Sequence, residues 1–335
     1  MATRVGINGF GRIGRVFTRI ALERDDVEVV AVNDITDART LATLLTFDST
    51  YGRLGRTVEH TPDSLIVDGR AIAVLSERDP AAIDWGGLGA EVVVESTGKF
   101  RTREAAELHL KGGARKVLIS APGGKGVDAT IVLGVNDGDY DPQRHDVISN
   151  ASCTTNCVAP MAKVLHDAFG VERGFMTTVH AYTGDQMLLD GPHKDLRRAR
   201  SAAVSIVPTT TGAARATGLV IPALAGRLDG VALRVPVEDG SLTDLAAVLS
   251  REVTAEQVNE AFAAAAASGP LAGLLRYSTD PIVSRDVIGE AASCLFDSAL
   301  TQASGTLVKV FGWYDNEWGY TCRLADLAAL AGSRL

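Results

Sequence analysis

The sequence predicts a two-domain α/β protein: a doubly wound, mostly parallel sheet followed by an α+β domain with a mixed sheet. Apolar strand-like runs alternate with helical patterns in the first half, whereas longer strand patterns dominate the second. The 335 residues are also enough for two ordinary domains. We therefore expect one domain at 1–152, completed by a C-terminal helix at 317–335, and a second domain at 153–316.

The elements expected in the first half have the composition of buried parallel strands and their covering helices. Short runs rich in valine, isoleucine and leucine predict the strands, and apolar residues at helical spacing predict the helices. The expected strands are Thr3–Asn8, Val27–Asn33, Glu91–Glu95 and Lys116–Ser120, and the expected helices are Gly11–Glu23 and Thr102–Lys111. A sheet of this kind binds its ligand at the carboxyl ends of the strands.

The second half predicts fewer helices and longer strands. The expected helices are Cys153–Phe169, a helix that begins after Thr254 and includes Ala263–Ala267, and Glu317–Ala331; the expected strands are Gly174–Tyr182, Gly230–Val237 and Leu307–Tyr314. A long polar and basic loop is expected at 183–205, and loops of this length in compact domains are usually functional.

Composition excludes several classes of protein. The net charge of −8 and the pI near 5.3 argue against a chain that coats nucleic acid or an anionic membrane surface. We expect no export signal and no membrane span, because the chain has neither a basic-then-apolar leader nor a sufficiently long apolar run. Four cysteines in a chain of this length do not make a disulfide framework. A reducing cytoplasm is the expected location.

A glycine-rich turn follows the first strand. Gly9, Gly11 and Gly14 match the G-x-G-x-x-G pattern, in which a dinucleotide pyrophosphate approaches backbone N–H groups at a helix N-terminus. Asp34 closes the second strand, where a carboxylate can accept hydrogen bonds from the adenosine ribose and repel a 2′-phosphate. This context predicts a Rossmann-type domain that prefers NAD over NADP.

Two further polar positions lie at strand ends. Ser96-Thr97-Gly98 follows one expected strand, and Ser120 ends another. Both lie where a doubly wound sheet holds its cofactor, but helix caps or turns explain them equally well.

The segment around Cys153 carries the strongest chemical signal. A small polar run places this thiol at the N-terminus of an apolar helix, where the helix dipole favours the nucleophilic thiolate. A metal site needs more ligands than Cys153 and Cys157 supply nearby, and a structural disulfide is improbable in the cytoplasm. A nucleophile at Cys153, with Cys157 as a packed small residue, fits best, and we expect no metal.

A thiol nucleophile needs a base, and histidine is the natural one. His60, His109, His145 and His166 lie in polar or ordinary helical contexts, for which a surface or capping role is the default. His180 ends a strand-like run before the long loop. Sequence alone cannot bring it to Cys153, and a histidine at a strand end is more often structural than catalytic.

Taken together, these segments resemble the phosphorylating glyceraldehyde-3-phosphate dehydrogenases over nearly the whole chain. The Ser-Cys-Thr-Thr-Asn run in order with the others makes the resemblance highly specific. The matching segments are Asn8–Gly14, Asn33-Asp34, Ser96–Phe100, Ala151–Asn156, Thr178–Thr183, Pro192–Arg198, Pro208–Ala214, Leu233–Pro236 and Trp313–Tyr320.

The resemblance implies a role for each matching residue. It makes Cys153 the nucleophile and His180 its base, and it implies NAD, glyceraldehyde 3-phosphate and inorganic phosphate as ligands. The implied cofactor contacts, with the loop glycines Gly9 and Gly11, are Arg12, Ile13, Asp34, Arg78, Ser120 and Asn316. Thr183 and Arg234 are implied around the substrate phosphate, and Ser152, Thr154, Thr211 and Gly212 around the inorganic one, with Arg198 serving the same anion-binding region.

The resemblance also implies a homotetramer in which the long loop lies at a subunit interface beside the cofactor. The chain departs from the family at Val237–Ser241, where Thr-Pro-Asn-Val-Ser is more usual, and in the glycine-rich run 123–126. Neither departure falls on a residue that the resemblance implies for the site.

Three alternatives stay open. One is the same chemistry on erythrose 4-phosphate, which the motifs do not exclude. The others are an NAD-binding regulator or nucleic-acid-binding protein without needed catalysis, which the acidic pI disfavours, and an amino-acid semialdehyde dehydrogenase, which should lack the Ser-Cys-Thr-Thr-Asn run combined with Asn316–Tyr320.

Overall fold

A computed structural model describes residues 2–335, which form two compact units. The first unit consists of the chain up to Ile131 together with Gly138–Ala151 and Thr321–Leu335. The second consists of Val132–Asp137 and Ser152–Tyr320. None of the helices within residues 2–335 is long and apolar enough to cross a membrane.

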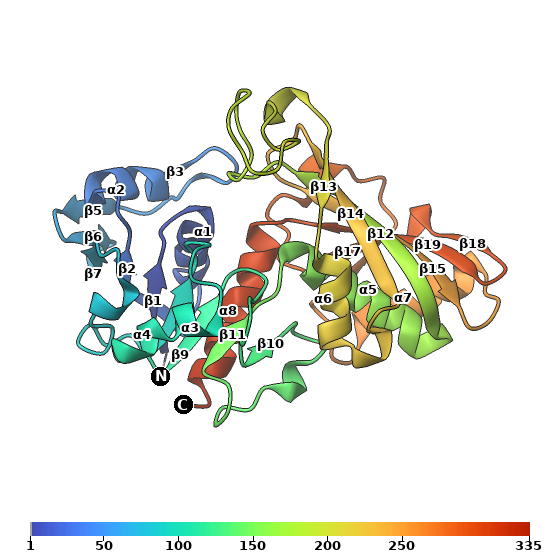
Figure 1. Cartoon of the computed structure of the whole chain (residues 1–335), viewed down its shortest axis with the longest axis horizontal. Helices are drawn as coiled ribbons and strands as arrows, with labels where there is room; N and C mark the ends of the chain where they lie inside the picture. The colour runs from blue at the N-terminus through green and yellow to red at the C-terminus, as the bar shows by residue number, and fades with distance from the viewer. Residues whose placement is uncertain (1) are drawn as a thin grey trace. The chain divides into compact units, whose positions relative to one another are not determined.

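The first unit is built on a nine-stranded sheet (Figure 1). Its strands, in chain order, are β1 (Thr3–Asn8), β2 (Val27–Asn33), β5 (Val58–Thr61), β6 (Ser64–Val67), β7 (Arg70–Leu75), β8 (Val92–Glu95), β9 (Lys116–Ile119), β10 (Ala129–Thr130) and β11 (Val147–Ser149). The spatial order is β10-β11-β9-β8-β1-β2-β7-β6-β5. All pairs from β10 to β7 are parallel, and only β7-β6 and β6-β5 are antiparallel. The carboxyl ends of β1, β2 and β8 therefore lie side by side.

Helices and a small hairpin complete this unit. They are α1 (Arg12–Ala21), α2 (Ala38–Thr46), α3 (Arg103–Ala106), α4 (Leu108–Lys111), α8 (Trp318–Gly332), whose first turn belongs to the second unit, and the hairpin β3 (Phe47–Asp48) with β4 (Gly52–Arg53). The single helix expected at Thr102–Lys111 is wrong in detail, because it is divided at Glu107. There the Leu110 N–H bonds to the Glu107 carbonyl, a tighter i→i+3 turn than an α-helix has.

The second unit contains an eight-stranded mixed sheet. Its strands are β12 (Val171–Ala181), β13 (Val207–Thr210), β14 (Leu228–Val235), β15 (Ser241–Leu249), β16 (Leu275–Ser278), β17 (Cys294–Asp297), β18 (Gln302–Ser304) and β19 (Leu307–Tyr314). The spatial order is β13-β14-β12-β15-β19-β17-β16, with β18 beside β19. Only β12-β14 and β16-β17 are parallel.

Three helices, α5 (Cys153–Phe169), α6 (Ala213–Val220) and α7 (Ala255–Ala267), pack against this sheet (Figure 1). Their apolar residues form one core with the strands, including Met161, Leu165, Met176 and Phe296. The expected fold class, a doubly wound sheet plus a domain with a mixed sheet, is confirmed.

Candidate active site

Cys153 is the first residue of α5 and is half-buried. Ser152 caps this helix, because its Oγ accepts a hydrogen bond from the Thr155 N–H at 3.0 Å. Ala151, just before the cap, has a φ of 57°, a left-handed conformation that costs free energy in a residue with a β-carbon. The turn that presents the thiol is thus held in a specific and strained geometry.

His180, the penultimate residue of β12, meets Cys153 directly. The distance from Cys153 Sγ to His180 Nε2 is 3.4 Å, although the two residues are 27 positions apart in the chain. The His180 ring is buried and packs edge-on against the Tyr314 ring, with centroids 5.9 Å apart. The thiol and imidazole are therefore within hydrogen-bonding reach of each other.

The other side of the imidazole contacts two groups with opposite hydrogen-bonding requirements. His180 Nδ1 lies 2.7 Å from the carbonyl oxygen of Ala181, which can only accept, and 3.0 Å from Arg234 Nη1, which can only donate. Arg234 Nη1 also lies 3.1 Å from the same carbonyl. With the hydrogen on Nδ1 and donated to this carbonyl, Nε2 keeps a lone pair that faces Sγ, and Arg234 donates to the carbonyl alone.

Burial and Arg234 dominate the electrostatics of the pair. Burial raises the pKa of the Cys153 thiol to about 11, against the opposing effects of Arg234 and of hydrogen bonds to Thr154. Burial, and then the Arg234 charge, lower the pKa of His180 to about 3. Desolvation is thus the largest influence on the pKa of this thiol, and it opposes the effect expected from the helix N-terminus. The proton is retained within the pair instead of being lost to water.

Asp239 adds an unexpected negative charge near the thiol. This residue is only 2% exposed, and its charge raises the pKa of Cys153. It lies in the segment 237–241 that departs from the family. The departure therefore places a buried carboxylate close enough to Cys153 to influence the pKa of its thiol.

The expected anion-binding residues of this unit belong to several segments. Thr183 is half-buried two residues beyond β12. Gly212 caps α6, and no atom lies within 4 Å of the position that a β-carbon would occupy there. Thr211 Oγ1 accepts from the Ala213 N–H at 3.2 Å. The Thr154 hydroxyl points to the buried Tyr314 hydroxyl at 2.9 Å.

Arg198 is anchored within the long loop. Its Nε lies 3.0 Å from Thr209 Oγ1, and its Nη1 is paired with Asp185. Its charge is close enough to the imidazole to contribute to the lowered pKa of His180. The structure therefore brings Cys153, His180, Arg234 and Arg198 into one electrostatic neighbourhood.

The glycine loop of the first unit satisfies the stereochemistry of dinucleotide binding. Gly9 has a φ of 95°, and a β-carbon there would lie 2.7 Å from the Thr97 nitrogen. Gly11 caps α1 and has no neighbour within 4 Å of that position, whereas a β-carbon on Gly14 would lie 2.5 Å from the Gly9 carbonyl oxygen. The first and third glycines allow tight packing, and the second leaves room for a pyrophosphate.

Asp34 and Arg78 line a pocket of about 120 Å³ beside this loop. The Asp34 carboxylate accepts from the Phe10 N–H at 2.8 Å and from the Thr36 N–H at 3.0 Å, which fixes its orientation. The remaining lining residues are Asn8, Asn33, Ile35, Glu77, Thr97, Lys99 and Phe100. The size of the pocket and its carboxylate suit part of an adenosine.

The remaining expected cofactor contacts have different surroundings. Arg12 forms a two-pronged ion pair with Asp48, at 3.1 and 3.2 Å, and Ile13 is half-buried in the first turn of α1. Ser120 follows β9 and donates its N–H to the Glu95 carbonyl at 3.0 Å. Asn316, in the second unit, is buried, and its Oδ1 accepts from Ser241 Oγ at 2.6 Å. No group of three or more potential metal ligands occurs in residues 2–335.

Sequence reasoning missed the residues that support these groups. Ser241 links Asn316 to the Ala181 N–H, and Tyr314 links Thr154 to Thr178. The surface or capping role expected for His109 is wrong, because this side chain is fully buried and lies 3.0 Å from Glu95. The apolar alternation of 241–249 was a signal for β15 and hence for the place of Ser241.

Comparison with known proteins gives matches in both halves of the chain. The family model for the glyceraldehyde 3-phosphate dehydrogenase NAD binding domain matches residues 3–103, and that for the C-terminal domain matches residues 152–316. Glyceraldehyde-3-phosphate dehydrogenase of Streptomyces coelicolor is 60% identical, with both chains covered completely. That of Geobacillus stearothermophilus is 58% identical over 100% of this chain and 99% of its own. Glyceraldehyde-3-phosphate dehydrogenase 1 of Bacillus subtilis is 57% identical over 98% of each chain.

These matches extend across both units and include the segments that carry the thiol, the imidazole and the glycine loop. The chain therefore belongs to the glyceraldehyde-3-phosphate dehydrogenase family.

Proposed function

We propose that this enzyme oxidises D-glyceraldehyde 3-phosphate to 1,3-bisphosphoglycerate with NAD and inorganic phosphate, through a thioester on Cys153. The observation that carries the proposal is the distance of 3.4 Å between Cys153 Sγ and His180 Nε2 in a chain of this family. Covalent catalysis divides the reaction into an oxidation and an acyl transfer, and the thioester conserves the oxidation energy between them.

The first half-reaction begins with proton transfer from Sγ to Nε2 of His180. The sulfur bonds to the aldehyde carbon, and the carbonyl π electrons move to oxygen, which gives a hemithioacetal oxyanion. The protonated imidazole keeps its proton and donates a hydrogen bond to that oxygen, which stabilises the negative charge. Bound NAD supplies the hydride acceptor for the oxidation that leaves the thioester. Arg234 Nη1 lies 3.0 Å from His180 Nδ1 and keeps a positive charge beside the imidazole. This charge favours loss of the proton that Nε2 has accepted from Sγ.

In the second half-reaction, a phosphate oxygen attacks the thioester carbon. The C–S bond breaks, the acyl phosphate leaves, and Cys153 recovers its proton from His180. We assign Thr183 and Arg234 to the substrate phosphate, and Ser152, Thr154, Thr211 and Gly212 to inorganic phosphate, with Arg198 serving this anion-binding region. Arginine forks and small hydroxyl groups are good phosphate ligands.

On the cofactor side we assign Gly9, Gly11, Arg12, Ile13, Asp34, Arg78, Ser120 and Asn316. The orientation of the Asp34 carboxylate and the open space at Gly11 support this assignment. A carboxylate at Asp34 also disfavours the 2′-phosphate of NADP.

We further propose a homotetramer that works in the cytoplasm. Large apolar side chains in the second unit support self-association, since Phe175 is 74% exposed and Leu196 is 82% exposed. None of the cysteines within residues 2–335 is in a disulfide, which agrees with a reducing compartment.

The test is an absorbance assay for NADH with the wild type and Cys153→Ala. With aldehyde and NAD, we expect sustained turnover only when inorganic phosphate is present, and a burst of at most one NADH per subunit without it. NADP should be a poor substitute for NAD, and erythrose 4-phosphate should have the lower kcat/KM of the two aldehydes. Substantial turnover by Cys153→Ala would contradict the thioester mechanism.

A further inference from the structure

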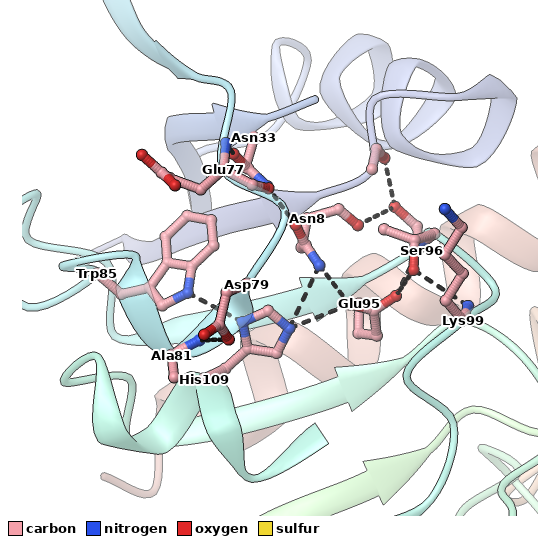
Figure 2. Close-up of polar contacts among 12 residues, drawn as sticks. Asn8, Asn33, Glu77, Asp79, Ala81, Trp85, Glu95, Ser96, Lys99 and His109 are labelled. Carbon is pink, nitrogen blue, oxygen red and sulfur yellow. Dashed lines mark hydrogen bonds and ion pairs between the residues drawn. The ribbon is translucent and has the colours of Figure 1, made fainter. Parts of the chain in front are cut away.

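A buried cluster of hydrogen-bonded side chains lies beneath the glycine loop of the first unit (Figure 2). His109, Glu95, Asn8 and Asn33 are between 0% and 4% exposed, and none of them has a part in the proposed chemistry. Asn8, Asn33 and Glu95 end the neighbouring strands β1, β2 and β8, and His109 comes from α4. Burial of strongly polar side chains costs free energy unless each of their donors and acceptors has a hydrogen-bond partner. The hydrogen bonds of this cluster therefore matter for the structure around it.

Trp85 fixes the tautomer of His109. Its Nε1–H, which can only donate, lies 3.0 Å from His109 Nδ1. His109 Nδ1 must therefore accept, so the hydrogen of the neutral ring is on Nε2. Nε2 lies 3.0 Å from Glu95 Oε2, to which it donates.

Glu95 receives hydrogen bonds from two sides. Oε2 accepts from His109 and from Asn8 Nδ2, the latter at 2.6 Å. Oε1 accepts from the Thr97 N–H at 2.9 Å and from the Thr97 hydroxyl. Every partner of the carboxylate is a donor, and an amide in its place would turn an NH₂ group toward another donor.

The cluster continues from Asn8 to the loop that contains Arg78. Asn8 Oδ1 accepts from Asn33 Nδ2 at 2.7 Å. Asn33 in turn bonds to both backbone groups of Glu77. Its Nδ2 donates to the Glu77 carbonyl at 2.8 Å, and its Oδ1 accepts from the Glu77 N–H at 2.7 Å. Arg78 is the next residue in the chain, so its backbone is anchored through Asn33.

The same hydrogen bonds hold the other walls of the pocket beside Asp34. Gly9 packs closely against Thr97, and Ser96 Oγ donates to the Gly9 carbonyl at 2.6 Å. Phe100, which lines the pocket, packs edge-on against the His109 ring at a centroid distance of 6.4 Å. The glycine loop, the Glu77-Arg78 loop and the Thr97–Phe100 loop are thus connected through Glu95 and His109.

We propose that Glu95 and His109 are positioning residues for the adenosine half of NAD: they hold these three loops in the one arrangement that binds it. The inference rests on the proposed cofactor site. If the hydrogen bonds are lost, the loops populate other arrangements, and the apparent affinity falls by the fraction of molecules that are competent to bind.

The test compares two matched pairs of variants by calorimetric titration of the full-length enzyme with NAD. Glu95→Gln should raise the Kd for NAD roughly tenfold or more, because a buried donor loses its acceptor. Glu107→Gln, the same change two residues before His109 at a side chain that is 40% exposed, should leave the Kd unchanged. His109→Phe should act like Glu95→Gln. His109→Gln, whose amide can accept from Trp85 and donate to Glu95, should stay within about threefold of wild type.

Two further measurements separate positioning from a general loss of structure. In the dehydrogenase assay, KM for NAD should rise in Glu95→Gln while KM for the aldehyde and kcat at saturating NAD change little. The inhibition constant of AMP against NAD should rise by the same factor as the Kd, because AMP tests the adenosine half alone. Thr97→Val, which removes one hydroxyl only, provides a milder variant if Glu95→Gln does not fold.

Several outcomes would overturn the inference. Wild-type Kd values in Glu95→Gln and His109→Phe, even with lowered melting temperatures, would reduce the cluster to a structural role. An unchanged AMP inhibition constant beside a raised Kd for NAD would contradict the adenosine assignment. If the wild type fails to bind NAD, the proposed cofactor site itself is wrong; if it binds NAD and the variants bind equally well, only the positioning role is wrong.

Discussion

At the scale of single residues, the protonation states of the Cys153 thiol and the His180 imidazole depend on each other. Burial makes each charged form unfavourable on its own, which is why the pKa of Cys153 rises and that of His180 falls. Transfer of the proton from Sγ to Nε2 creates both charges 3.4 Å apart, where their attraction offsets the loss of hydration. The geometry therefore favours transfer within the pair as the sulfur attacks.

The Asp239 charge gives this pair a testable pH dependence. A negative charge disfavours the thiolate and so raises the pKa of Cys153. Asp239→Asn removes that charge, and we expect the thiol pKa to fall and the pH profile of iodoacetamide alkylation to move to lower pH. At a fixed pH below the thiol pKa, the rate should rise by roughly two- to tenfold, since one pKa unit is a tenfold change in thiolate.

The neighbouring Glu238 provides the control for this experiment. Its side chain is more exposed than that of Asp239 and is paired with Arg285 at 2.8 Å. Glu238→Gln should leave the alkylation profile in place. A profile that moves to higher pH in Asp239→Asn would mean that the carboxylate stabilises the thiolate, contrary to the sign argued above.

At the scale of secondary structure, strand pairing produces the site. His180 on β12 is the register partner of Arg234 on the parallel strand β14, and α5 packs on the same sheet with Cys153 at its first turn. The sequence predicts both strands and the helix. It does not predict the register, because a shift of one residue is invisible in a pattern of apolar residues but turns the side chains to the other face.

Local signals explain which elements the sequence predicts well. Thr3–Asn8, Val27–Asn33 and Leu307–Tyr314 are strands with the predicted bounds, because short β-branched runs favour strands by themselves. The burial of His109 is not predicted, for the opposite reason. Its partners Trp85 and Glu95 come from other parts of the chain, and nothing in the residues next to it indicates burial.

The caps of α5 and α7 lead to a prediction at this scale. Ser152→Ala removes the oxygen that accepts from Thr155, and Thr254→Ala removes the corresponding oxygen in a capping box with Gln257. Each change should lower the free energy of unfolding by about 1 kcal/mol. Ser152→Ala should also lower kcat, because Cys153 is the next residue, whereas Thr254→Ala should not.

Denaturant unfolding and steady-state kinetics of both variants check this. Ser152→Thr, which keeps a capping oxygen, should recover most of the lost stability and part of the activity. Equal kinetic losses in Thr254→Ala would show that kcat follows global stability and not the position of the thiol.

At the scale of the whole molecule, each unit supplies a different part of the function. The first unit carries the glycine loop and its supporting cluster, and the second carries the thiol, the imidazole and the arginines. The sequence predicts this division because the two halves differ in the order of their strands and helices. The periodicity of the sequence carries no information on quaternary structure. The proposed homotetramer therefore rests on the resemblance and on the exposed apolar residues.

Those exposed residues lead to the last prediction. Phe175 on β12 and Val231 on β14 are 74% and 51% exposed, although their strands lie in the interior of the second sheet. Leu188, Leu189 and Leu196 of the long loop are each at least 74% exposed. Burial of one phenylalanine side chain contributes about 1.5–3 kcal/mol, and a symmetric interface buries it more than once.

Phe175→Lys should therefore reduce the mass measured by light scattering from that of a tetramer to that of a dimer or monomer. Leu44→Lys, at a 40% exposed site on α2, should leave the mass unchanged. If Phe175→Lys stays tetrameric at low micromolar concentration, this face of the sheet is not buried between subunits, and the association must use another surface.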